Sequence, residues 1–167
     1  MSIDLALLIL RITIGGLIFA HGTQKLFGWF GGRGLAGTRA MIQRQRMRPT
    51  WLWMWLAIFS EAGGGLLFAL GLLSPLGALG IIAAMLMAMI LVTWPRFWGS
   101  QNGIEYNLLF VIPAIVEAVS GPGRYSLDAL MGLMLPAPAS FLVVLLLVLI
   151  GIGFALATRL PATSVSV

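Results

Sequence analysis

The chain has 167 residues, of which 60% are hydrophobic and 9% are charged, and its formal net charge is +5. Soluble domains carry about 25% charged residues, so this composition excludes an ordinary soluble protein and indicates a single-domain membrane protein. Cysteine is absent, which excludes disulfides, thiol redox chemistry and cysteine-ligated iron–sulfur clusters. His21 is the single histidine, so one chain cannot hold a bis-histidine haem, and we expect no metal site.

Apolar segments follow one another along the chain, and a helix needs about 20 such residues to cross a bilayer. The first segment is not a signal peptide, because no basic residues precede it and no A-x-A site follows it. Pro and Gly residues separate the later segments. The predicted crossings are residues 3–22, 52–73, 76–94, 104–120 and 139–158.

The charges are distributed unequally between the two ends of these predicted helices. Lys25 and five arginines lie in the first connection, and Arg96 and Arg159 fall on the same side. The positive-inside rule therefore predicts a protein of the inner (cytoplasmic) membrane with its N-terminus outside and its C-terminus inside. Such a local basic stretch beside apolar spans favours lipid over nucleic acid as a partner. Indole rings prefer the headgroup region, and all six tryptophans lie toward the basic side: Trp29, Trp51, Trp53, Trp55, Trp94 and Trp98.

The first connection allows two structures between Leu35 and Arg48. One is a short helix at the membrane surface, with Met41, Ile42 and Met47 inserted into lipid and the arginines at anionic headgroups. The other is a disordered basic loop, favoured by the glycines near its start. Both alternatives stay open at this point.

Small residues recur inside the predicted spans. They are Gly15-Gly16, Gly63-Gly64-Gly65, Gly77 and Gly80. Helices in lipid associate through close backbone approach, so we expect these glycines to mark contacts between helices.

Ionisable residues inside the spans are the candidate functional groups, because such groups are costly in lipid and pair within a bundle. Measured from the outer end, Arg11 lies roughly 12 Å deep, Glu61 roughly 18 Å and Glu117 roughly 6 Å. His21 lies roughly 27 Å deep, near the basic side. Side chains lean toward the N-terminus of their own helix, which favours an outer Arg11–Glu117 ion pair and an inner His21–Glu61 pair. An Arg11–Glu61 pair is the alternative, and a purely structural role for these groups also stays open.

Short motifs follow one another along residues 3–130: Leu10-Arg11, His21-Gly22, Lys25-Leu26-Phe27-Gly28, Glu61 with Gly64-Gly65, Leu70-Gly71, Glu105-Tyr106 and the run from Gly121 to Asp128. This ordered set resembles the DoxX family. The resemblance implies an all-α, DoxX-like four-helix transmembrane bundle in residues 1–130, to which residues 131–167 add a fifth transmembrane helix and a short tail. The family takes its name from the membrane subunit of a thiosulfate:quinone oxidoreductase, so the resemblance also suggests a redox assembly.

Two functions fit these observations. In the first, the chain is a membrane subunit of a quinone-linked complex, and His21 donates a hydrogen bond to a quinone carbonyl. Glu61 orients His21 or relays a proton, and Lys25 or Tyr106 lies at the mouth of the site. The sequence contains no recognisable redox cofactor site, so electrons would come from a partner subunit or from another bound group. In the second, it is a non-catalytic subunit that anchors a larger membrane complex. A small transporter ranks third, because no inverted repeat is visible.

Overall fold

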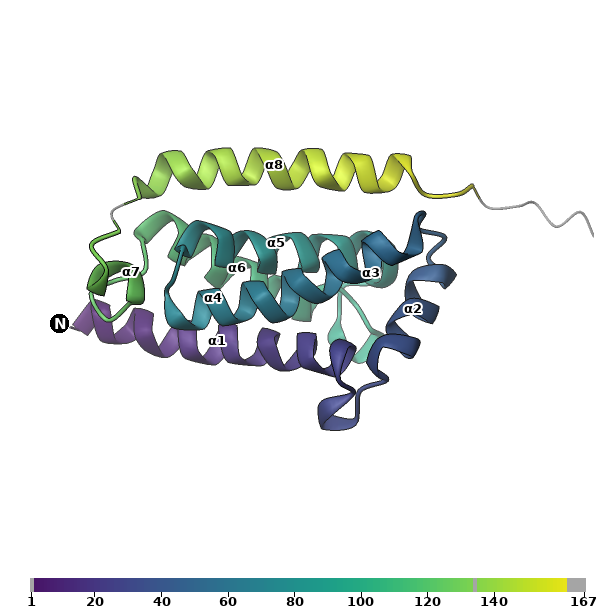
Figure 1. The fold of residues 1–167 in the computed structure, drawn as a ribbon, viewed down its shortest axis with the longest axis horizontal. Coiled ribbons are helices and arrows are strands. Elements are labelled where there is room, and N and C mark those ends of the chain that lie inside the picture. The colour runs from purple at the N-terminus through teal and green to yellow at the C-terminus, as the bar shows by residue number, and fades with distance from the viewer. Residues whose placement is uncertain (1, 134, 162–167) are drawn as a thin grey trace, which may run out of the picture.

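The computed structural model describes residues 2–133 and 135–161, and in that part of the chain every regular element is a helix. Together with its apolar helices, this makes the chain an all-α membrane protein (Figure 1). Four helices are long and apolar enough to cross a bilayer: Ser2–Leu26, Thr50–Leu70, Ser74–Thr93 and Ala139–Ala157. The remaining predicted crossing forms a helix of 16 residues, Glu105–Ser120, which runs beside Ser74–Thr93.

Several of these helices contain irregular turns. The second span is a helix interrupted by a π-helical turn, and the third ends in one. The elements are α1 (Ser2–Leu26), η1 (Trp29–Gly31), α2 (Gly34–Arg44), α3 (Thr50–Ile58), η2 (Phe59–Gly63), α4 (Gly64–Leu70), α5 (Ser74–Ala88), η3 (Met89–Thr93), η4 (Gly99–Gln101), α6 (Glu105–Ser120), α7 (Leu127–Leu130) and α8 (Ala137–Ala157).

The long helices lie side by side, with α8 packed along α5 and α6 and with α2 across one end of the bundle (Figure 1). One core joins Ile18 of α1, Phe68 of α4, Ile81 of α5, Ala114 of α6 and Val148 of α8. Helix α8 thus contributes to the core, while its opposite face is exposed and apolar. The additional C-terminal helix is therefore an integral part of the packed structure.

The glycines inside the spans lie where helices touch. A Cβ atom built on Gly15 of α1 would lie 2.5 Å from the backbone nitrogen of Ala69 in α4. A Cβ on Gly64 would lie 2.9 Å from the Cα of Gly80 in α5. The expected helix contacts are confirmed at these positions, whereas Gly16 and Gly63 face open space.

The first connection contains the helix α2, so the alternative of a wholly disordered loop is wrong. The predicted insertion of Ile42 and Met47 into lipid is also wrong, because both side chains are buried against Met54, Ile58 and Ala155. The reason is that the connection folds back onto the ends of α3 and α8. The backbone nitrogen of Leu160 donates to the carbonyl of Arg46 at 3.0 Å, which holds the two segments together.

Candidate functional site

Arg11 lies fully buried in the half of the bundle that contains the N-terminus. Its Nη2 donates to the carbonyl of Tyr125 at 2.5 Å. Gly71, which follows α4 with a left-handed φ of +61°, makes room for the guanidinium, since any Cβ at this position would collide with Nη1 of Arg11. Glycine is therefore required here both by the backbone conformation and by the neighbouring arginine.

Glu117 of α6 is also fully buried and interacts electrostatically with Arg11. Nε and Nη1 of Arg11 and both carboxylate oxygens of Glu117 have no hydrogen-bond partner among the described residues. The two groups therefore share one buried region and attract each other across it without a direct hydrogen bond. Burying such groups is costly, so each depends on the other for its stability in the bundle.

Asp128 belongs to the same end of the bundle as Arg11 and Glu117. It is buried, and it accepts hydrogen bonds from the backbone nitrogens of Leu73 at 2.8 Å and Ser74 at 2.9 Å, and from Oγ of Ser74 at 2.5 Å. The carboxylate thus caps the N-terminus of α5. The backbone nitrogen of Arg124 donates to Asp4 at 3.0 Å. The dipeptide Ser74-Pro75 signals a helix start, but no sequence pattern identifies a cap 54 residues away.

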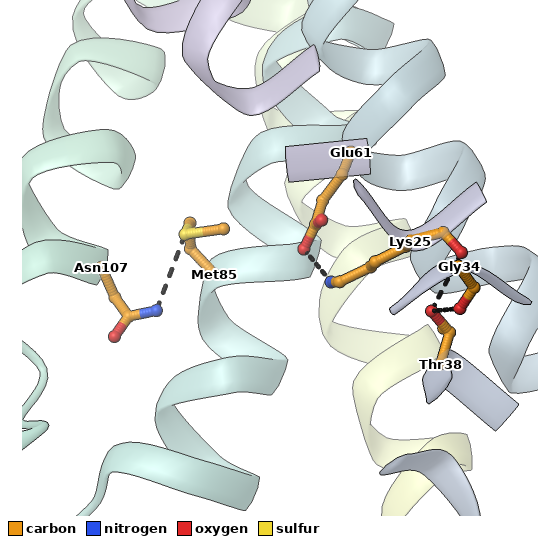
Figure 2. A network of polar contacts seen from close by, with 6 residues as sticks. All are labelled: Lys25, Gly34, Thr38, Glu61, Met85 and Asn107. Carbon is orange, nitrogen blue, oxygen red and sulfur yellow. Dashed lines mark hydrogen bonds and ion pairs between the residues drawn. The ribbon is translucent and has the colours of Figure 1, made fainter. Parts of the chain in front are cut away.

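At the opposite end, the partner of Glu61 is Lys25 and not His21 (Figure 2). Nζ of Lys25 donates to Oε1 of Glu61, while Oε2 has no hydrogen-bond partner among the described residues. Gly22 packs against Ala62, and Lys25 lies three residues after Gly22 on the same side of α1. This contact brings the lysine to the carboxylate and joins α1 to the second span.

Two further side chains, those of Thr38 and Asn107, form hydrogen bonds near this end of the bundle (Figure 2). Oγ1 of Thr38 in α2 lies 3.0 Å from the carbonyl of Lys25 and 2.9 Å from that of Gly34. Nδ2 of Asn107 in α6 donates to Sδ of Met85 in α5 at 3.6 Å. Helix α2 is therefore held against the last turn of α1, beside the Lys25–Glu61 pair.

The four residues expected around a quinone separate into two pairs. Lys25 and Glu61 contact each other inside the bundle. His21 is exposed and lies edge-on to Phe110 of α6, with 6.4 Å between the ring centroids. Tyr106 precedes Phe110 by about one helical turn and is 61% exposed. His21 and Tyr106 therefore belong to an aromatic surface of α1 and α6, apart from Glu61.

A cavity of about 680 Å³ lies beside α2, on the basic side of the bundle. The sequence did not predict this cavity. Its charged lining residues are Lys25, Arg33, Arg44 and Arg159, and no acidic residue lines it among those the structure describes. Met41, Leu91 and Val92 form an apolar part of the wall. The cavity is strongly basic because Lys25 at the end of α1, Arg33 and Arg44 at the two ends of α2, and Arg159 beyond α8 all line it.

The model of one protein family, described as DoxX, matches residues 6–94, just over half of the chain. Arg11, His21, Lys25 and Glu61 fall within the matched residues, whereas Tyr106, Glu117 and α8 lie beyond them. Neither the curated proteins nor the solved structures provide a match to this chain.

Proposed function

This chain belongs to the DoxX family of membrane proteins, and from that premise we propose that it is a structural subunit that anchors a larger membrane complex. The observation that carries this proposal is the contact between Lys25 and Glu61. The quinone hypothesis requires the carboxylate of Glu61 to interact with His21. Instead, this carboxylate accepts a hydrogen bond from Lys25, which joins α1 to the second span. Arg11 and Asp128 likewise contact backbone groups of distant segments, as structural residues do.

The test is purification of the full chain from its native membrane in a mild detergent. Gel analysis would identify co-purifying proteins, and mass spectrometry of the lipid extract would detect quinones. We expect a partner in fixed stoichiometry and no quinone that depends on this chain. Purification of the chain by itself with one bound quinone per molecule would contradict a purely structural role.

A quinone site is the second candidate, and the packing of His21 against Phe110 favours a location different from the one first expected. The imidazole of His21 and the hydroxyl of Tyr106 are donors on an exposed surface near the end of the bundle. Phe110 of α6 contacts His21 and follows Tyr106 by about one helical turn, so it adds an aromatic ring to this surface for contact with a quinone. Quinones diffuse within the bilayer, so this surface is accessible to them without an internal channel.

Binding of a short-chain ubiquinone to the reconstituted protein tests this candidate. His21→Ala should weaken binding by about tenfold, the contribution of roughly one hydrogen bond, without changing the melting temperature. Glu61→Gln is the matched control and should leave quinone binding unchanged. Equal losses of quinone binding in both variants would support the His21–Glu61 site expected from the sequence. Unchanged binding in both variants would leave only the structural role.

A further inference from the structure

We propose that the basic cavity beside α2 binds the phosphate headgroup of one anionic phospholipid from the adjacent leaflet. Lys25 lies in the last turn of α1, Leu91 and Val92 lie in η3 at the end of the third span, and Arg159 follows α8. The cavity therefore opens where three membrane-spanning helices end, which is the depth of lipid headgroups.

The charge of the lining selects an anion. Glu61 neutralises Lys25 through their ion pair, whereas Arg33, Arg44 and Arg159 face a cavity with no acidic lining residue among those described. Nε of Arg159 donates to the carbonyl of Gln45 at 3.1 Å, which holds this side chain at the cavity. Guanidinium groups bind phosphate oxygens in a two-pronged geometry. A neutral quinone would leave all three positive charges without a counter-ion.

The apolar wall favours a lipid over a free phosphate ion. Met41, Leu91 and Val92 line the same cavity as the arginines, and Val92 is 49% exposed. Inorganic phosphate makes no use of such a wall, but the first carbons of an acyl chain bury it. The volume of about 680 Å³ is in the range of sites that hold small organic ligands and is sufficient for a glycerophosphate headgroup.

The cavity is also held in shape before any lipid binds. Helix α2 forms one of its walls, and Thr38 ties this helix to the carbonyl of Lys25. Ile42, on the same helix, is buried against the ends of α3 and α8. A wall fixed in this way reduces the ordering cost of binding.

Native mass spectrometry of the full chain with added phosphatidylglycerol or phosphatidylcholine of matched acyl chains tests the proposal. We expect one phosphatidylglycerol molecule to remain bound in preference to phosphatidylcholine. One arginine at an anionic membrane surface changes binding by about fivefold, so Arg33→Gln with Arg44→Gln should lower retention by about 30-fold. The control, Arg39→Gln with Arg96→Gln, removes the same charge from the same side but outside this cavity, and should change retention less than threefold.

Thermal melting of each variant in detergent establishes that it is folded before retention is compared. Equal losses in both double variants would show general charge attraction and would overturn the proposal. Equal retention of phosphatidylcholine would overturn it as well. Displacement of the lipid by inorganic phosphate at micromolar concentration would identify a free anion as the ligand and reject the lipid.

Discussion

Lys25 in the last turn of α1 donates a hydrogen bond to Glu61 in the π-helical turn η2, 36 residues further along the chain. The two helices are in contact at this level, because Gly22 packs against Ala62 beside the carboxylate. Figure 2 shows the lysine side chain reaching the carboxylate of Glu61. Lys25 is also one of the residues that line the basic cavity. One side chain therefore contributes both to the packing of α1 and to the wall of the basic cavity.

The first prediction concerns this contact. Lys25→Met should lower the free energy of unfolding by about 2 kcal/mol, because it removes a charged hydrogen bond from a nearly buried carboxylate. Adding Glu61→Gln should recover part of the loss, and Lys25→Arg should retain most of the stability. Chemical denaturation in detergent measures these differences. If His21→Ala destabilises the protein as much and Glu61→Gln rescues it, the inner pair is His21–Glu61 after all.

The second prediction concerns the buried arginine. Arg11→Leu should cost about 3–5 kcal/mol of unfolding free energy, since it leaves the Glu117 carboxylate buried without a counter-charge. Arg11→Leu with Glu117→Gln should recover part of that loss. Arg124→Leu, at an exposed arginine near the same end, is the control and should change stability by less than about 0.5 kcal/mol. Rescue by Glu61→Gln instead of Glu117→Gln would show that the alternative pairing is correct.

The third prediction uses adjacent glycines as a matched pair. Gly15→Ala should destabilise the protein by about 1–3 kcal/mol, because its methyl group would overlap the backbone of α4. Gly16→Ala should be neutral or stabilising by up to about 1 kcal/mol, because its Cβ meets no atom within 4 Å and alanine favours a helix. Melting temperatures of the two variants in one detergent provide the comparison. Equal destabilisation would contradict close packing of α1 on α4.

The fourth prediction is the orientation in the membrane. The chain has no cysteine, so single cysteines report their position directly. Ala36 on α2 and Ala129 on α7 are exposed and lie near opposite ends of the bundle. In sealed cells, Ala129→Cys should react with an impermeant thiol reagent, and Ala36→Cys should react only after permeabilisation. The reverse pattern would place the basic side outside.

Features that depend on residues close together in the sequence could be predicted from the sequence alone. Long apolar runs predicted the helices, because only a helix satisfies its own backbone groups in lipid. The small residues at Gly15, Gly64 and Gly80 predicted contacts between helices, because close approach requires that side chains be absent. The burial of Arg11 and Glu117 followed from the same reasoning, since charged groups avoid lipid.

Only the tertiary structure decided which of these groups meet. Each residue turns the helix by about 100°, so depth along a helix does not determine which neighbour a side chain faces: His21 is exposed beside Phe110 while Lys25 contacts Glu61. The fold of the connections could not be predicted from the sequence either, because it depends on contacts between distant residues. Met47 is buried by α3 and α8, and Asp128 caps a helix that begins 54 residues before it. The basic cavity likewise forms only when Arg33 and Arg44 of the first connection meet Arg159 beyond α8. Composition and local pattern thus determined the helices, and the rotation and packing of those helices determined the site.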